Sequence, residues 1–297
     1  MRSIVSPLSG IRSPFGLRDG ASVYAILGFD PALVFDFVGN YFRKGSAAST
    51  FGASITHARA SSATMMNSSG ALVTVGNNVP RTGHHIYNGS AWVNEGILHE
   101  SEARTNLLTD SNDFAAWAKT NLTATVNQAT GPDGTVSATE IGVTSIPSNS
   151  YAIKNATNTS GTLSYFVKQN TERFFIIVRG AYASGDWAIF DLSTGTVSKS
   201  PTHSGSSTEM VPMGNGWYRC VLQSTQSSNI NAFSISGSGT DNTTVTSGTV
   251  YLWGAQFEAG STPSSYIPTT SATVTRAAET LTVPAANLPY NSTNMSI

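Results

Sequence analysis

Residues 106 to about 276 contain at least eight short segments rich in Val, Ile, Thr, Phe, Tyr and Trp, separated by Gly, Asn, Ser and Pro. Segments of this kind are typical of strands, and the residues between them favour tight turns. No segment has the long helical pattern that a parallel crossover requires. We therefore predict an all-β fold whose main part is an antiparallel β-sandwich of the jelly-roll type.

Four shorter patterns add local expectations. Residues 174–178 are apolar throughout, which predicts a central strand buried on both faces. Residues 162–165 alternate in polarity, which predicts a half-exposed strand. Residues 110–117 have capping side chains before an apolar step and predict a single helical turn. The Gly-Pro-Asp-Gly sequence at 131–134 predicts a tight turn.

The segment 251–257 has a pronounced aromatic pattern. Strand alternation puts its odd-numbered residues, which include Tyr251, Trp253 and Phe257, on one face and its even-numbered residues on the other. We expect the aromatic face to be buried, so Trp253 is predicted to belong to the core. Residues 260–265 would then form the turn out of the sandwich, and residues 266–268 would fasten the exit to its side.

The composition limits the class of protein. Charged residues are 11% of the chain, against about 25% in an average soluble domain. Hydroxyl residues take their place, with 41 Ser and 36 Thr among 297 residues. A surface of this kind is typical of extracellular or virion β-proteins. The formal net charge is −1 with no basic stripe, which argues against nucleic-acid binding.

The chain has no apolar run of transmembrane length, and its first residues lack the apolar core of a signal peptide. We therefore expect that the chain is made in a cytoplasm and does not insert into a membrane. The single cysteine, Cys220, excludes an intramolecular disulfide and is predicted to be a buried thiol. A chain made in a cytoplasm but suited to outside conditions fits a virion protein released by lysis.

Four parts are predicted along the chain. They are an extended attachment segment (1–48), a small β-rich connector (49–105), the jelly roll (106–279) and the start of a further strand or domain (280–297).

Residues 6–18 contain two copies of a short pattern, Ser-Pro, an apolar residue, Gly, an apolar residue and Arg, with one extra Ser in the first copy. Proline favours extended backbone and glycine favours a turn, so this segment cannot build a core alone. We expect it to lie along a partner surface, although a disordered tail is the alternative. The candidate docking residues are Pro7, Leu8, Ile11, Arg12, Pro14, Phe15, Leu17 and Arg18.

Two blocks of sequence carry a family resemblance. The first consists of residues 56–64 (THARASSAT), 70–74 (GALVT), 78–81 (NVPR), 96–100 (GILHE), 102–108 (EARTNLL) and 113–117 (DFAAW). The second consists of residues 251–260 (YLWGAQFEAG), 264–269 (SSYIPT) and 274–278 (VTRAA). Found together in this order, they resemble a family of tailed-bacteriophage structural proteins, the fibres and spikes of the tail or head, which carry a carbohydrate-binding-module-like jelly roll.

The resemblance implies a protein of the virion surface. Its N-terminal segment would attach it to other virion proteins, and its β-rich connector would oligomerise, with a homotrimer as the first expectation. The jelly roll would face outward and bind host-surface polysaccharide. A purely structural decoration or adaptor subunit without glycan binding is the main alternative, and a glycan-degrading enzyme is the less favoured one.

The sequence shows no catalytic motif. Its five histidines include no H-x-x-x-H or H-E-x-x-H spacing, and neither a C-x-x-C, a G-x-S-x-G nor a P-loop sequence occurs. No two of the 17 acidic residues stand out as a glycosidase pair. We therefore expect no enzyme activity and no cofactor.

Glycan binding requires aromatic platforms for sugar C–H faces and polar groups for hydroxyls. The candidates that combine these types in the predicted sandwich are Tyr151, Arg179, Tyr182, Asp186 and Trp187. Loop oxygens often bind a structural Ca²⁺ in such sandwiches, and the candidate ligands are Asp133 and Glu258.

Overall fold

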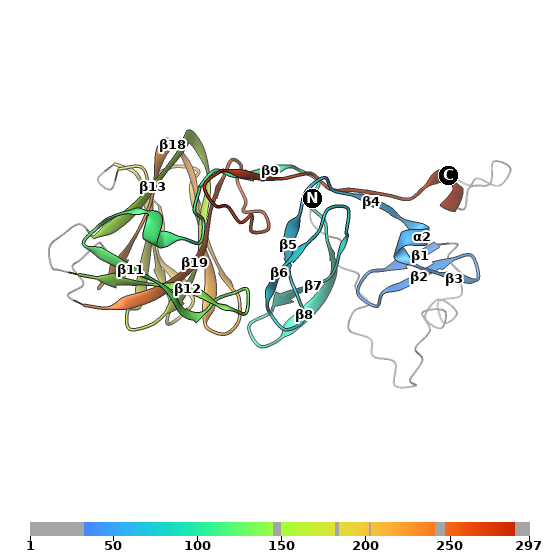
Figure 1. Ribbon diagram of the computed structural model, residues 1–297, viewed down its shortest axis with the longest axis horizontal. Coiled ribbons are helices and arrows are strands. Elements are labelled where there is room, and N and C mark those ends of the chain that lie inside the picture. Colours follow the sequence, from blue (N-terminus) through green and yellow to red (C-terminus); the bar gives the residue numbers. More distant parts are fainter. Residues whose placement is uncertain (1–32, 145–149, 182–183, 202, 241–246, 289–297) are drawn as a thin grey trace. The chain divides into compact units, whose positions relative to one another are not determined.

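The computed structural model describes residues 33–144, 150–181, 184–201, 203–240 and 247–288 (Figure 1). The chain divides into two compact units, one made of Met1–Thr56 with Thr282–Ile297 and the other of His57–Leu281. Strands make up nearly all of the regular structure, which confirms the predicted all-β fold class. Within the described ranges, the structure contains no helix with the length and apolar content needed to span a bilayer.

The first unit contains a small antiparallel sheet of β1 (Leu33–Asp36), β2 (Tyr41–Lys44) and β3 (Ala47–Ser49), with the short helices α2 (Phe51–Ser54) and η2 (Ala285–Asn287). The ring of Phe42 contacts those of Phe35, Phe37 and Phe51 at centroid distances of 6.1, 5.7 and 5.9 Å. These rings give residues 33–49 an apolar core, so they form a folded sheet where the sequence predicted an extended segment as far as residue 48.

The predicted docking residues of the N-terminal segment lie outside the described residues. They are Pro7, Leu8, Ile11, Arg12, Pro14, Phe15, Leu17 and Arg18.

The second unit is built around the sandwich. Ten strands of the described residues form it: β10 (Ala118–Thr120), β11 (Leu122–Thr130), β12 (Val136–Val143), β13 (Tyr151–Gln169), β14 (Phe174–Arg179), β15 (Asp186–Asp191), β16 (Thr196–Lys199), β17 (Ser207–Pro212), β18 (Trp217–Ser236) and β19 (Thr249–Glu258). Their pairings are antiparallel.

The long strands β13 and β18 belong to both layers of the sandwich. Residues 151–155 of β13 pair with β10 and with residues 230–233 of β18, and this first layer continues through β14, β15 and β16. Residues 162–169 of β13 pair with residues 217–223 of β18 and with β19. This second layer continues through β17 on one side and through β12 and β11 on the other.

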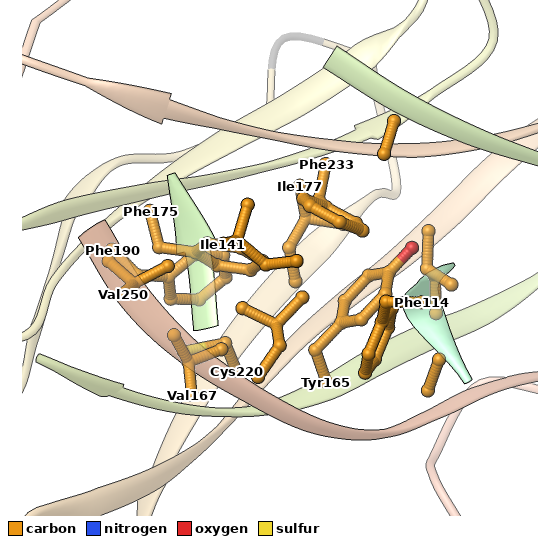
Figure 2. Close-up of a cluster of buried hydrophobic side chains, with 14 of the residues drawn as sticks. Phe114, Ile141, Tyr165, Val167, Phe175, Ile177, Phe190, Cys220, Phe233 and Val250 are labelled. Carbon is orange, nitrogen blue, oxygen red and sulfur yellow. The ribbon is translucent and has the colours of Figure 1, made fainter. Parts of the chain in front are cut away.

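The main core lies between the two layers, and Figure 2 shows the apolar side chains that meet there. Tyr165 of the second layer contacts the rings of Phe175 and Phe233 of the first layer at 5.8 and 5.6 Å. Phe114 and Trp117 add two further rings from the 3-10 turn η1 (Phe114–Ala116) and the residue after it. The predicted single helical turn is therefore confirmed, and it contributes to the core.

Two predictions about strand burial have different outcomes. Residues 175–178 are buried, as predicted, because both faces of β14 are covered. Phe175 and Ile177 belong to the main core, and Ile176 and Val178 belong to a smaller apolar cluster on the other face. Residues 162–165 are also fully buried, so the prediction of a half-exposed strand is wrong. Residues 260–266 cover the outer side of this strand, where the Thr162 hydroxyl donates to the Gly260 carbonyl at 2.8 Å. Cys220 is buried as predicted, and burial raises the pKa of its thiol well above the ordinary value.

A bulge in β19 changes which residues share a face. The register of β13 against β19 shifts between Ser164 and Phe166, where β19 has one extra residue. Gly254 lies in this bulge with φ +58°, a conformation that glycine adopts without strain. The extra residue reverses the alternation, so Trp253 faces a second, outer apolar cluster while Phe257 faces the main core. The prediction that both rings share one face is wrong, but the predicted burial of Trp253 is confirmed at 4% exposure.

The buried side chain of Arg179 holds the bend at which β13 and β18 pass from one layer to the other. The pairing of these strands shifts register between residues 155 and 161, so backbone carbonyls lose their ladder partners there. The Arg179 guanidinium donates to the carbonyls of Thr159, Ser228 and Ile230, and it lies 3.9 Å from the centre of the Phe257 ring. One cationic side chain therefore satisfies several carbonyls that the bend leaves unpaired.

The remaining strands lie outside the sandwich. They are β4 (Thr56–Ala58), β5 (Ala63–Met66), β6 (Leu72–Val75), β7 (Arg81–Tyr87), β8 (Trp92–Leu98), β9 (Arg104–Asn106), β20 (Val274–Arg276) and β21 (Thr280–Thr282). β5 pairs with β6 and β7 with β8, and these two hairpins lie side by side (Figure 1). β9 pairs with β20, and β4 with β21.

The β5–β6 hairpin packs on the outer side of the second layer. The backbone N–H of Leu72 donates to the carbonyl of Pro132, in the predicted Gly-Pro-Asp-Gly turn, at 2.8 Å. The Leu72 side chain contacts the outer cluster, which consists of Ala138, Phe166, Trp217, Trp253 and Tyr266. That turn is confirmed by the hydrogen bond from the Gly134 N–H to the Gly131 carbonyl at 3.0 Å.

An ion cluster, made of Arg59, Arg81, Glu100, Arg276 and Glu279, joins the hairpins to the C-terminal part of this unit. The Glu279 carboxylate accepts from Arg59 at 2.5 Å, from Arg81 at 2.8 and 3.0 Å, and from the backbone N–H of Glu100 at 2.8 Å. Arg81 also donates to Glu100 at 2.7 Å. Burial alone would raise the pKa of Glu279, but these hydrogen bonds and charges lower it to about 2.

A second group of buried polar side chains fastens the segment after β19. The Asn106 amide donates to the carbonyls of Ala255 and Ile267 at 3.1 and 2.9 Å. The hydroxyls of Ser111 and Tyr266 lie 2.7 Å apart in a buried hydrogen bond. Residues 56–117 and 251–279 thus contact each other here, through Asn106, and in the ion cluster, through Glu100 and Arg276.

Candidate functional site

A cleft of about 360 Å³ lies between the β7–β8 hairpin and two turns of the sandwich. The hairpin contributes Tyr87 and Gly89, and the β15–β16 turn contributes Thr194 and Gly195. The remaining lining residues come from the β17–β18 connection and its ends: Pro212, Gly214, Asn215, Gly216, Trp217 and Tyr218. Residues far apart in the sequence therefore share one cleft.

The sequence Gly-Asn-Gly determines the shape of the β17–β18 turn. Gly214, Asn215 and Gly216 have φ values of +71°, +52° and +79°, and the Trp217 N–H donates to the Gly214 carbonyl at 2.9 Å. Glycine and asparagine are the residue types that adopt this left-handed conformation most readily. The turn also needs glycine for space, because a Cβ on Gly214 would lie 3.0 Å from Cζ2 of Trp92.

Trp92 fixes the hairpin against this turn. Its indole lies against Gly214 on the sandwich, and its ring centre is 5.4 Å from that of Tyr87, its cross-strand partner. On the other side of the cleft, the Trp217 indole donates to the Thr130 carbonyl at 3.2 Å and is 3% exposed. Both walls of the cleft are therefore held by buried or half-buried aromatic side chains.

The lining of the cleft is uncharged. It combines the half-buried rings of Tyr87 and Tyr218 with the exposed side chain of Asn215. Within the described residues, the Asn215 amide and the two tyrosine hydroxyls form no intramolecular hydrogen bond. Lys168 lies beside Gly216 without being part of this lining, with Cε, the carbon that carries its ammonium group, 3.4 Å from the position that a Cβ on Gly216 would take. The cleft can thus stack an apolar face and exchange hydrogen bonds with hydroxyl groups.

Two of the residues predicted to bind glycan are fully buried, and for them the prediction is wrong. Arg179 and Asp186 are both 0% exposed. Arg179 donates to the carbonyls at the bend of the sandwich, and burial lowers its pKa to about 10. Asp186 accepts hydrogen bonds from Ser206, Ser224 and His203 at 2.6, 2.5 and 2.7 Å. Intramolecular partners therefore occupy the groups that a sugar would need.

Of the other three predicted residues, Trp187 and Tyr151 do not line the cleft. Trp187 is half-buried in β15, and the Lys199 ammonium lies 3.8 Å from its ring centre, so this chain's own side chain covers one ring face. Tyr151 begins β13 and is 36% exposed. Tyr182 lies outside the described residues. Glycan contact at Trp187 and Tyr151 stays a prediction.

The cluster around Asp186 contains a histidine and two serines, the residue types of a hydrolytic triad. Nucleophilic catalysis requires a hydrogen bond between the serine hydroxyl and the histidine. Both Ser206 and Ser224 instead donate to the carboxylate, and His203 contacts the same carboxylate through Nδ1. Burial would raise the pKa of Asp186, but these hydrogen bonds lower it below the ordinary value. The arrangement keeps an ionised carboxylate satisfied and leaves no activated nucleophile in it.

The two predicted calcium ligands each have partners of their own. Asp133 accepts from the backbone and hydroxyl of Thr135 at 3.1 and 2.8 Å and from Ser137 at 2.7 Å. Glu258 is 0% exposed and accepts from Gln256 and from the Ser264 N–H, both at 2.7 Å. In the ranges that the structure describes, no group of three or more His, Cys, Asp or Glu is placed to hold a metal. Calcium binding stays a prediction.

Sequence reasoning missed Tyr87, Asn215 and Tyr218. The Gly-Asn-Gly sequence at 214–216 was a usable signal, because it marks a left-handed turn before a strand. No local pattern shows that the β7–β8 hairpin lies against this turn, since that contact depends on the tertiary fold.

Comparison with known proteins gives little similarity. No family model and no curated protein matches the sequence. Among solved structures, the chain is similar to the crystal structure of a glycoside hydrolase family 43 arabinoxylan arabinofuranohydrolase from Bacillus subtilis in complex with cellotetraose. The TM-score is 0.29 and the identity 14%, over 59% of this chain and 32% of that one. This chain thus spans about a third of the length of that enzyme.

Proposed function

We propose that this chain is a structural protein of the virion surface of a tailed phage, a fibre or spike, whose sandwich unit binds host-surface glycan without altering it chemically. Its N-terminal region attaches it to other virion proteins, and the assembled form is a homotrimer. The virion role is supported by the two sequence blocks and by a surface rich in hydroxyl residues and poor in charge.

Glycan binding is supported by one observation above all, the uncharged cleft with aromatic rings and free polar groups. Sugar rings present C–H faces to aromatic side chains and hydroxyls to neutral polar groups, so this lining matches their chemistry.

A role without catalysis is supported by the same lining. Glycoside hydrolysis uses two carboxyl groups that flank the scissile bond. None of the residues that line the cleft is an Asp, a Glu or a His. The Asp186 cluster lacks the serine–histidine hydrogen bond of a nucleophile.

The test is a glycan array probed with the full chain, with release of reducing sugar measured on every glycan bound. Binding without release is the expected result. An absence of binding to any host-surface polysaccharide would favour a purely structural subunit. Release of reducing sugar would identify an enzyme, and labelling of phage particles with an antibody to this chain would test the virion role separately.

A further inference from the structure

We infer that the cleft between the β7–β8 hairpin and the β17–β18 turn is the sugar-binding site, and that it selects a neutral saccharide. The inference rests on the proposed function and deepens it, because it names the site and the ligand class. In this site the sugar ring stacks on Tyr87 and Tyr218, and its hydroxyl groups form hydrogen bonds with the side-chain amide of Asn215.

The cleft offers polar groups that are not engaged within the described part of the protein and are therefore available to a ligand. Arg179 and Asp186, the two polar residues that the sequence predicted to bind glycan, are buried and hydrogen-bonded within the protein. In the cleft, by contrast, the side-chain amide of Asn215 and the hydroxyls of Tyr87 and Tyr218 make no hydrogen bond to the described residues. An amide supplies both donors and an acceptor, which suits the paired hydroxyls of a sugar ring.

The absence of charge in the lining decides the ligand class. An acidic sugar carries a carboxylate or sulfate, which binds well only where a cationic group pairs with it. The residues that line the cleft include no Arg or Lys. Lys168 lies outside this lining, and its Cε, the carbon that carries the ammonium group, is 3.4 Å from the position that a Cβ on Gly216 would take. A neutral hexose needs no counter-charge. The volume of about 360 Å³ lies at the lower end of small-molecule sites, which favours a short stretch or a chain end over a long polymer.

The site also depends on the docked position of the hairpin. Tyr87 belongs to the hairpin, whereas Asn215 and Tyr218 belong to the sandwich. Trp92 connects the two parts by its contacts with Tyr87 and Gly214. A sugar bound between these walls contacts both parts at once, so bound sugar stabilises the docked hairpin.

The experiment measures binding of the full chain to neutral oligosaccharides of two to six hexose units and to matched oligosaccharides that contain uronic acid or sulfate. The neutral set is expected to bind more tightly. The variants Tyr87→Leu and Tyr218→Leu remove one ring face each and are expected to weaken binding about tenfold. Asn215→Gly keeps the left-handed turn, removes the amide and is expected to weaken binding by about five- to tenfold.

Matched controls are Tyr151→Leu and Trp187→Leu, which change two aromatic residues that the sequence predicted to bind glycan but that do not line the cleft. Both variants are expected to bind the oligosaccharides as tightly as the unchanged chain does. Thermal unfolding of each variant checks that it is folded. Unchanged binding in all three cleft variants, or loss of binding only in the two controls, would overturn the cleft assignment and leave the proposed function standing. Preference for acidic sugars would overturn the ligand class. If the unchanged chain binds no glycan of any kind, the proposed function fails together with this inference.

Discussion

Replacement of Glu279 by alanine tests how strongly the ion cluster holds the second unit together. The Glu279 carboxylate is buried and accepts four hydrogen bonds, three of them from the guanidinium groups of Arg59 and Arg81. Without it, Arg81 keeps Glu100, but Arg59 keeps only backbone carbonyls as hydrogen-bond acceptors. Removal of one partner from a buried ion pair costs about 3 to 5 kcal/mol, because a buried charge is left uncompensated.

This cost predicts a large change in thermal stability. For a domain of about 150 to 250 residues, each kcal/mol shifts Tm by about 2 to 4 °C, so Glu279→Ala is expected to lower Tm by about 6 to 20 °C. Calorimetry of the full chain measures the shift of the transition of the second unit, which spans His57–Leu281. The tryptophan fluorescence of Trp117 and Trp253, both buried in that unit, identifies this transition.

The matched control is Glu102→Ala, which also removes a carboxylate paired with an arginine. The Glu102 side chain is 73% exposed, and such surface pairs contribute about 0 to 1 kcal/mol. In the double variant Glu279→Ala with Arg59→Met, part of the lost stability should return, since the uncompensated charge of Arg59 is gone. Equal Tm values for Glu279→Ala and Glu102→Ala would refute the reasoning that the ion cluster holds the unit closed.

Three further predictions concern the same unit. Because folding lowers the pKa of Glu279 to about 2, the Glu279 carboxylate is protonated at a higher pH in the unfolded chain than in the folded one. Stability should therefore decrease from about pH 4.5 to pH 2, as measured by urea unfolding, and an equally steep decrease in Glu279→Gln would contradict this. Gly254→Ala should lower the free energy of unfolding by about 1 to 3 kcal/mol, because φ is +58° and a Cβ would lie 2.9 Å from the Phe166 ring. The control Gly76→Ala, whose Cβ would lie 4.0 Å from its nearest neighbour, should lower it by less than about 1 kcal/mol. Equal urea midpoints for these two variants would contradict the bulge argument. Tyr165→Phe should leave the free energy of unfolding within about 1 kcal/mol or raise it, since the buried hydroxyl has no hydrogen-bond partner among the described residues, and a loss above 2 kcal/mol would show that the hydroxyl has one.

The fold class was predictable from the sequence because strand and turn signals are local. Residues 174–178 were read correctly as a central strand, since an unbroken apolar run needs cover on both faces. Residues 162–165 were read wrongly, because Thr162 and Ser164 look like solvent-facing residues. The segment 260–266 covers them, and a long-range contact of that kind leaves no trace in the periodicity of the strand.

The candidate site was less predictable than the fold. Arg179 and Asp186 were singled out because polar residues beside aromatic ones suit a sugar site, yet both serve as buried hydrogen-bonding groups inside the protein. Polarity alone does not distinguish a buried polar anchor from an exposed ligand contact. The cleft depends on a hairpin and a turn that are far apart in the sequence and meet only in the folded chain. At Gly254, one extra residue in β19 changes which side chains of the strand face the main core.

The central claim is that glycan binds in the cleft while the ion cluster only holds the unit closed. Hydrogen–deuterium exchange of the full chain, with and without the tightest neutral glycan from the array, tests it most directly. The account predicts slower exchange at residues 87–92 and 212–218 when glycan is bound, with the strands near Tyr151 and Trp187 unchanged. Slower exchange confined to residues 151–155 and 186–199, or no change in 87–92 and 212–218 under saturating glycan, would contradict it.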